Sequence, residues 1–223
     1  VIKVFVELHK KKLIYKDEKL VNWDTVLKTA ISDLEVDQRE MNSKIYYIKY
    51  PIDHSNEFIT IATTRPETML GDTAIAVNPK DKRFKKYVGM TVTIPLVGRK
   101  IKIIKDNYAD PEQGTGALKI TPAHDFNDYD VGKRNKLDII NVFTKEGKIN
   151  KNAPENYTGL DRFEARKKIL EELKEKDFFV KEENIKNKVP YGDRSNSIIE
   201  PFLTEQWFAD AEKLSVKAKE VVN

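Results

Sequence analysis

The chain has 223 residues, of which 39% are hydrophobic and 34% are charged, and 40 basic against 36 acidic side chains give it a net charge of +4. This composition is typical of a soluble globular protein, and the length suits one substantial domain with appendages. The absence of cysteine excludes thiolate catalysis, disulfide bonds and cysteine-based zinc sites, and the small net charge excludes nucleic-acid binding driven by the charge of the whole surface.

The N-terminus and the apolar runs indicate a cytosolic chain, and we expect it to be an internal part of a larger protein. No apolar run approaches the roughly 18 residues of a membrane helix, so we expect no membrane partner. The lysines of residues 1–12 stand at the wrong end for a signal peptide. The three histidines, at positions 9, 54 and 124, are scattered, so we expect no metal site.

In chain order, the pattern predicts an amphipathic helix over residues 1–13 and an irregular bridging segment with short strands over 14–42. Further along, we expect strands at 45–50, 58–63, 73–77, 91–95, 100–104, 117–121 and 139–142, and helices near 125–135, 160–176 and 215–222. Many short strands with few helices favour an α+β, β-rich fold, a barrel-like sheet decorated by helices. We divide the chain into an N-terminal connecting helix with its bridging segment (1–43), a central domain (44–191) and a C-terminal connecting segment (192–223).

The first candidate site segment is the polar connection between the strands predicted at 58–63 and 73–77. It is punctuated by Pro66 and Gly71, as turns are, and it concentrates hydroxyl groups between apolar runs. Its candidate binding residues are Thr63, Thr64, Arg65 and Thr68. Threonine is also a good strand residue and arginine is usually a surface charge, so a purely structural interpretation stays open here.

The second candidate segment, residues 114–134, predicts a strand that runs into a helix. Pro122 should end the strand, and Asp125 stands where the helix N-cap belongs. Asp125 and Asp128 are three residues apart and share one helix face, where exposed N–H groups should keep both carboxylates ionised and able to attract an ammonium or hydroxyl group. The alternatives are that Asp125 is a plain cap and Asp128 a solvated surface charge. Lys119 and Thr121 lie on the strand beside them.

Together, TTRPETMLGD (63–72) and GTGALKITPAHDFNDYDVGKR (114–134) resemble the inserted editing domain, connective peptide 1, of class I aminoacyl-tRNA synthetases, in particular their valyl branch. Residues 20–36 and 189–210 look like the segments by which that domain leaves and re-enters its parent enzyme. The resemblance therefore covers nearly the whole chain. The HIGH and KMSKS signatures with which the family activates its amino acid are absent, as is a Walker A motif, so we do not expect this chain to aminoacylate tRNA.

The resemblance implies hydrolysis of threonine wrongly attached to valine tRNA, and it leaves open whether threonyl adenylate is cleaved as well. Asp125 would then bind the substrate ammonium and Asp128 the threonine hydroxyl. Lys119, with Thr121, would hold the terminal adenosine and stabilise charge on the ester oxygen, while water acts as the nucleophile. The opposite wall would be formed by Thr63, Thr64, Arg65 and Thr68.

The same resemblance implies that editing needs no cofactor and no metal, since ATP and Mg²⁺ serve the synthetic domain of the parent. The expected partners are the 3′ end of tRNA(Val) and the rest of the parent enzyme, with the chain itself a monomer. Gln113 departs from the family, whose members often have an aromatic residue there, and puts adenine stacking at that point in doubt. Two alternatives remain: a non-catalytic module that binds the tRNA 3′ end or serves a structural role, and an editing domain for another amino acid.

Overall fold

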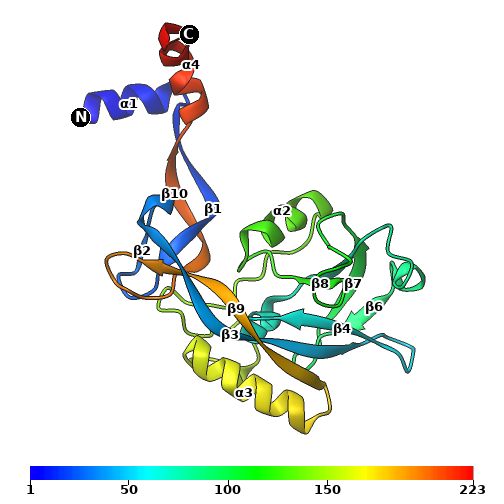
Figure 1. Ribbon diagram of the computed structural model, residues 1–223. Coiled ribbons are helices and arrows are strands. Elements are labelled where there is room, and N and C mark those ends of the chain that lie inside the picture. The colour runs from blue at the N-terminus through cyan, green and yellow to red at the C-terminus, as the bar shows by residue number, and fades with distance from the viewer. Residues whose placement is uncertain (223) are drawn as a thin grey trace.

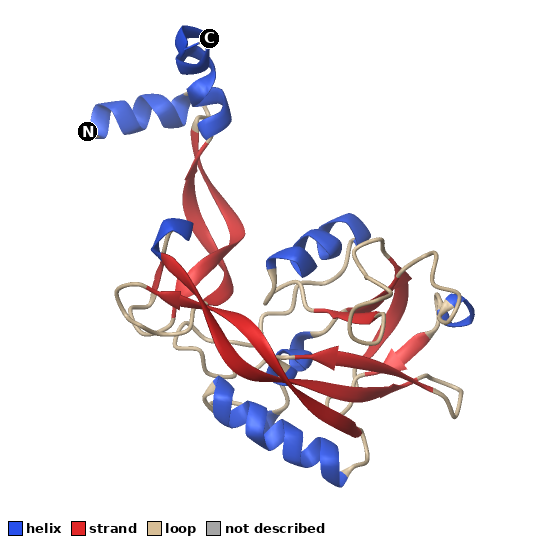
Figure 2. Cartoon of the chain, in the orientation of Figure 1, coloured by secondary structure: helices blue, strands red, loops and turns tan. Residues whose placement is uncertain are grey.

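The computed structural model describes residues 1–222 as a mixed α+β fold that is rich in strands (Figures 1 and 2). The α-helices are α1 (Ile2–Lys10), α2 (Phe126–Asn135), α3 (Arg162–Glu175) and α4 (Ala211–Val222). The strands are β1 (Ile14–Asp24), β2 (Thr29–Ala30), β3 (Val36–Pro51), β4 (Phe58–Thr63), β5 (Ala74–Val77), β6 (Thr91–Thr93), β7 (Lys100–Lys105), β8 (Ala117–Ile120), β9 (Phe179–Gly192) and β10 (Glu200–Ala209). Short 3₁₀ helices are η1 (Asp33–Glu35), η2 (Pro66–Gly71), η3 (Lys85–Tyr87) and η4 (Glu155–Tyr157).

The described strands form three separate sheets, in the orders β10-β1-β2, β4-β3-β9 and β6-β7-β5-β8. The expected α+β class is confirmed, but none of these sheets closes into a barrel. The second and third sheets meet through an isolated bridge between Ile52 and Val92. On the other side, β4 lies against β8 without a ladder of hydrogen bonds. Both strands are short and stop just before the polar segments that begin at Thr64 and Thr121. Side chains therefore make the contacts along the seam between the two strands.

The segment 14–42 is not irregular, which corrects the sequence-based expectation. It holds the 11-residue strand β1 and the first part of the 16-residue strand β3, which continues through residue 44 without a break. β1 pairs along its length with β10, and β3 pairs with β9. These partners are far apart in sequence, and their exposed faces carry many charged residues, so neither strand has a strong local signal. In Figure 1 the β1–β10 ribbon stands away from the rest of the chain and carries α1 and α4 at its tip.

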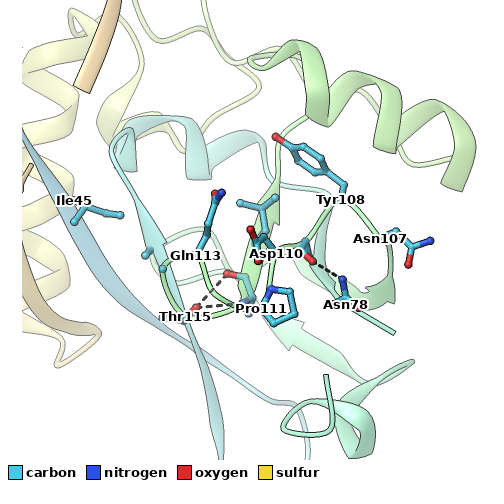
Figure 3. Close-up of a pocket in the computed structure, with 14 residues that line it drawn as sticks. Ile45, Asn78, Asn107, Tyr108, Asp110, Pro111, Gln113 and Thr115 are labelled. Atoms are coloured by element: carbon cyan, nitrogen blue, oxygen red, sulfur yellow. Dashed lines mark hydrogen bonds between the residues drawn. The ribbon is translucent and has the colours of Figure 1, made fainter. Parts of the chain in front are cut away.

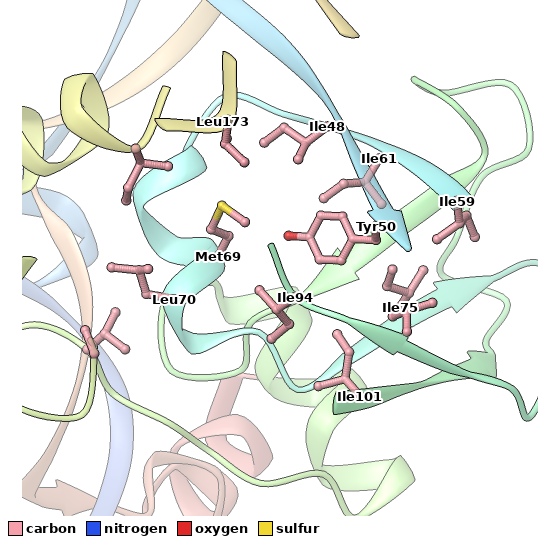
Figure 4. Close-up of a cluster of buried hydrophobic side chains, with 14 of the residues drawn as sticks. Ile48, Tyr50, Ile59, Ile61, Met69, Leu70, Ile75, Ile94, Ile101 and Leu173 are labelled. Atoms are coloured by element: carbon pink, nitrogen blue, oxygen red, sulfur yellow. The ribbon is translucent and has the colours of Figure 1, made fainter. Parts of the chain in front are cut away.

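The main hydrophobic core lies between the two sheets that contain β3 and β5, and α3 covers it (Figure 4). Tyr50 and Ile61 from the first sheet meet Ile75 from the second, while Met69 of η2 and Leu173 of α3 close the cluster. All five side chains are fully buried. Because η2 is part of this core, the polar residues on its two sides are held rigidly.

Most of the expected central elements are present, with small differences at their ends. The strand expected at 139–142 is wrong, because this segment is a loop packed over Gly71, where an added Cβ would lie 2.7 Å from the carbonyl oxygen of Ile140. Residues 114–116, Gly-Thr-Gly, form a turn that leads into β8, with φ of +57° at Gly114 and +81° at Gly116. Within residues 1–222, no helix has the length and apolar character needed to cross a membrane.

Gly132 lets α2 approach Pro122 closely, since an added Cβ would lie 2.7 Å from the Pro122 Cγ. Alanine normally stabilises a helix by about 1 kcal/mol relative to glycine, whereas overpacking costs about 1–3 kcal/mol. We expect Gly132→Ala to lower the free energy of unfolding, measured by urea denaturation. Lys133→Ala, on an exposed position of the same helix, should leave it nearly unchanged. A more stable Gly132→Ala variant would show that this contact is not tight.

Candidate functional site

Lys119 lies at the centre of a buried polar network between β8 and η2. The side chain is only 8% exposed, and its Nζ donates to Thr68 Oγ1 at 2.9 Å, to Asp72 Oδ1 at 3.0 Å and to Thr121 Oγ1. Alternation along β8 directs Lys119 to the opposite face from its neighbours Leu118 and Ile120. The three N–H groups of the ammonium are therefore matched by three oxygens, which is the condition for burying such a charge.

Asp72 completes this network, although the sequence analysis did not select it. Its side chain is fully buried, Oδ1 also accepts from Thr121 Oγ1 at 2.5 Å, and Oδ2 accepts from the Tyr50 hydroxyl at 2.8 Å. Burial raises the pKa of the Asp72 carboxyl, and the Lys119 charge and the hydrogen bonds oppose that rise. The available signal was a single acidic residue after Gly71, within an otherwise mostly apolar stretch.

Asp125 is the N-cap of α2, as expected. Its Oδ1 accepts from the backbone N–H groups of Asn127 at 2.9 Å and Asp128 at 3.1 Å. Its backbone is extended (φ −152°, ψ 134°), as is usual for an N-cap residue. Among the described residues no donor reaches its other oxygen, Oδ2, and the residue is exposed. The capping role therefore leaves one carboxylate oxygen available for a ligand.

Asp128 is buried rather than solvated, with 6% of its surface exposed. Its Oδ2 accepts from the backbone N–H of Thr121 at 2.8 Å, which connects α2 to the Lys119 network. Burial, followed by the nearby charge of Asp125, raises its pKa to about 7. The expectation that both carboxylates stay readily ionised is wrong for Asp128, because desolvation outweighs the helix N-terminus. Its Oδ1 accepts no hydrogen bond within residues 1–222.

Arg65 belongs to a second charged group on the other side of η2. Its guanidinium donates to Glu67, to the carbonyl oxygen of His124 and to Glu200. Thr63 is buried, and its Oγ1 accepts from the Arg65 backbone N–H at 3.0 Å. Sequence reasoning missed Glu67 and Glu200, since only the tertiary fold brings strand β10 next to η2.

A cavity of about 680 Å³ lies beside the Gly-Thr-Gly turn (Figure 3). Gln113, Asp110 and Tyr108 line it, together with Ala62 of β4 and Leu118 of β8. Tyr108 extends from this cavity toward α2: burial, followed by the charges of Asp125 and Asp128, raises the pKa of its hydroxyl. Tyr108 thus connects this cavity to the charges at the start of α2.

A second cavity, of about 390 Å³, lies against the N-terminus of α2. Thr64, Arg65, Asp125 and Phe126 line it, together with Phe163 of α3. Thr64 here and Ala62 in the first cavity flank the buried Thr63 at the end of β4. The two cavities share no lining residue, and Asp125 lines the second.

His124 has a structural role. It is buried against Phe143, with ring centroids 4.4 Å apart, and its Nε2 accepts from the Val142 backbone N–H at 3.0 Å. Burial, followed by the charges of Arg65 and Lys119, holds its pKa well below the ordinary value. The ring is therefore neutral near pH 7 and anchors the loop that follows α2. Within residues 1–222, no group of three or more potential ligands could hold a metal ion.

The structure thus brings together most of the residues that the sequence selected, in two groups that share η2. The first group joins Lys119, Thr121, Thr68 and Asp128 by hydrogen bonds. Asp125 adjoins it through the α2 cap. The second group contains Arg65 with Thr63, and Thr64 lines the cavity next to it.

The raised pKa of Asp128 predicts that this carboxyl lowers the free energy of unfolding as the pH rises. Below about pH 4 this carboxyl is protonated in both the folded and the unfolded chain, and above its folded-state pKa the buried carboxylate destabilises the fold. Since one pKa unit is about 1.4 kcal/mol, the penalty reaches at most roughly 4 kcal/mol at pH 8. We expect Asp128→Asn to gain free energy of unfolding relative to the wild type between pH 4 and pH 7, with a plateau above. Urea denaturation across this range measures the difference.

Asn127→Ala is the matched control for this titration, because it changes an uncharged, exposed side chain in the same turn of α2. Its stability difference from the wild type should not change with pH over this range. If Asp128→Asn showed no relative gain as the pH rises, the Asp128 carboxyl would not carry a raised pKa.

Comparison with known proteins shows the family. The model for tRNA synthetases class I (I, L, M and V) matches residues 1–223. A valine–tRNA ligase of Pelagibacter ubique is 82% identical over 223 residues, which are 100% of this chain and 26% of that protein. A valine–tRNA ligase of Bdellovibrio bacteriovorus is 52% identical over 219 residues, covering 98% of this chain and 24% of that protein. The chain thus spans about a quarter of the length of these relatives.

Among solved structures, the leucyl enzyme (LeuRS) of Agrobacterium radiobacter K84, in a ternary complex with tRNA and LeuAMS, matches with a TM-score of 0.51. The match covers 83% of this chain and 32% of that one, and at 18% identity it supports the fold alone. The family model that matches the whole chain and the two valine–tRNA ligases give one result. The chain belongs to the class I tRNA synthetases.

Proposed function

We propose that this chain is the editing region of a valine–tRNA ligase, which hydrolyses the ester of threonine wrongly attached to tRNA(Val). One observation carries the proposal: two carboxylates at the start of α2, Asp125 and Asp128, each keep one oxygen without a partner among the described residues, beside a buried ammonium and threonine hydroxyls. The 82% identity to a valine–tRNA ligase supports the choice of parent enzyme.

The need for such a site follows from the similar shapes of valine and threonine. A hydrophobic pocket rejects an isostere with an added hydroxyl by only about a hundredfold, a limit already known for valyl enzymes. A second site must therefore select for the hydroxyl. A site whose buried polar group pairs with that hydroxyl would leave the group unpaired when valine is bound, at a cost of about 1–3 kcal/mol.

Asp128 suits the recognition of the hydroxyl. It is buried, so a missing partner is costly there, and its Oδ2 is already fixed by the Thr121 N–H. With a pKa of about 7, its carboxyl can accept a hydrogen bond from the threonine hydroxyl when ionised and donate one when protonated. Valine offers neither partner.

Asp125 suits the substrate ammonium. Its Oδ2 is available and exposed toward the smaller cavity, and a carboxylate–ammonium contact is a charge-assisted hydrogen bond. The two aspartates would thereby divide the recognition of the α-amino group and the side chain. The spacing of three residues on one helix allows both contacts with a single amino acid.

Lys119 is proposed to act through its charge. Its three N–H groups are engaged by Thr68, Asp72 and Thr121, so the ammonium would stabilise negative charge on the ester oxygen by its field. Thr63 and Thr64 would place the ester from the β4 side. Water would be the nucleophile, positioned on a reactive ester, without a cofactor. Gln113 and the larger cavity beside it would face the terminal nucleoside of the tRNA.

The proposal predicts different defects at the two aspartates. Asp125→Asn keeps the cap but loses the charge, and the loss of charge-assisted hydrogen bonds, about 1.5–3 kcal/mol, should slow deacylation of threonyl-tRNA(Val) by about 10- to 100-fold. Asp128→Ala should lower the selectivity for threonine over valine by a similar factor. Asp130→Ala, an exposed carboxylate on the same helix, should change neither. The measurement is the rate of ester hydrolysis with each charged tRNA.

The same assay separates the alternatives. Full activity of Asp125→Asn would refute its assignment to the ammonium. A wild-type chain that binds the tRNA 3′ end but hydrolyses neither ester would be a binding module that depends on the rest of the synthetase. Hydrolysis of a different aminoacyl ester would assign another substrate.

A further inference from the structure

Five charged residues form a cluster, here called the arginine–glutamate cluster, that joins three parts of the chain. Its members are Arg65, Glu67, Arg162, Arg166 and Glu200. The side chains of Glu67 and Glu200 are 0% and 4% exposed, so their charges depend on the arginines around them. Arg166 holds Glu67 with two hydrogen bonds, of 2.7 and 2.8 Å, and Arg162 Nε lies 2.8 Å from Glu200 Oε1.

Arg65 differs from the other two arginines because each of its side-chain nitrogens contacts a different segment. Nε donates to Glu67 of η2 at 3.3 Å, Nη1 donates to the carbonyl oxygen of His124 at 3.1 Å, and Nη2 pairs with Glu200 of β10. A guanidinium is a rigid planar fork, so these three contacts fix the relative positions of the segments. These contacts use three of the five N–H groups of Arg65 and hold its side chain in one orientation.

The hydrogen bond to the His124 carbonyl affects the next residue, Asp125, to which the proposed function assigns the substrate ammonium. The His124 carbonyl belongs to the peptide bond that links the two residues, so its orientation sets the start of the Asp125 backbone. Asp125 in turn caps α2 through the N–H groups of Asn127 and Asp128. A shift of this peptide would therefore move the carboxylate and weaken its cap.

The contact to Glu200 reaches the ribbon of β1 and β10. Glu200 is the first residue of β10, and it pairs with Trp23 on β1. From this point the ribbon runs outward to α1 and α4, which carry both chain termini in Figure 2. Arg65 thus connects the base of the ribbon to the residue before Asp125 by two hydrogen-bonded contacts.

We propose that Arg65 is a positioning residue. Through it, the position of the β1–β10 ribbon at Glu200 determines the position of the Asp125 carboxylate. Arg65 acts through the His124 carbonyl and does not touch the amino acid. Deformation of the ribbon at Glu200 would then change how well Asp125 holds the substrate ammonium. The substrate part of this inference rests on the proposed function, whereas the positioning part does not.

Amide hydrogen exchange tests the positioning part without any substrate. In Arg65→Lys the lysine keeps a charge next to Glu200 but cannot hold three segments at once. We expect the Asn127 and Asp128 amides to exchange about tenfold faster, relative to the core amides of β5, because their cap is loosened. Arg166→Lys is the matched control: it loses a two-bond contact in the same cluster but does not touch His124. It should leave these two amides unchanged.

Kinetics test the substrate part. An ammonium contact made equally in the bound and transition states affects KM more than kcat, so Arg65→Lys should raise KM for threonyl-tRNA(Val) about tenfold with a smaller change in kcat. The threonine-to-valine preference should persist, because the Asp128 carboxylate is held separately by the Thr121 N–H. Glu200→Gln should act in the same direction but less strongly, while Arg166→Lys should keep the KM of the wild type.

Each outcome has a separate meaning. Unchanged exchange of Asn127 and Asp128 in Arg65→Lys, or equal acceleration in Arg166→Lys, would overturn the positioning role. If the wild-type chain hydrolysed neither ester but exchange were faster in Arg65→Lys and not in Arg166→Lys, the positioning role would be supported and the proposed function refuted. A kcat that falls while KM stays constant would overturn the link to ammonium binding.

Discussion

The buried ion pair of Lys119 and Asp72 is the interaction on which the candidate site depends. It joins β8 to the residue that follows η2, 47 positions earlier in the chain, inside a region where water cannot screen either charge. Removing one partner of such a pair leaves the other charge buried and typically costs about 3–5 kcal/mol. The cost of burying the Asp72 carboxylate is offset further by hydrogen bonds from Thr121 and Tyr50 to the same group. The two sequence motifs are thus held together by a fully satisfied polar network, which is what keeps their functional groups in place.

On this support, two neighbouring aspartates acquire different properties from their surroundings. Asp125 stands exposed at the helix end, whereas Asp128 is buried and its carboxyl has a pKa of about 7. Different environments of two neighbouring carboxyl groups often indicate separate chemical tasks. Here the exposed group fits an ammonium, and the buried one fits a hydroxyl whose absence would leave it unpaired. A site built in this way would distinguish two amino acids of nearly equal shape by a hydrogen bond instead of by size.

Local signals predicted the parts of the site that depend on local chemistry. Pro122 and Asp125 gave the end of β8 and the start of α2, and the threonines of the first motif were found where a strand ends. What could not be predicted depends on contacts between distant residues: the burial of Asp128, and the pairing of Glu200 with Arg65 across 135 positions. The long pairings of β1 with β10 and β3 with β9 were missed for the same reason. The expected barrel failed because the period of two identifies strands but says nothing about whether the last strand meets the first.

The most direct test of this account is a crystal structure of the chain with a non-hydrolysable threonyl-adenosine analogue. The account predicts the threonine ammonium within hydrogen-bonding distance of Asp125 Oδ2, its hydroxyl at Asp128 Oδ1, and the adenosine in the cavity beside Gln113. A threonine side chain placed away from Asp128, or an ammonium that contacts Arg65's glutamate partners instead of Asp125, would contradict it.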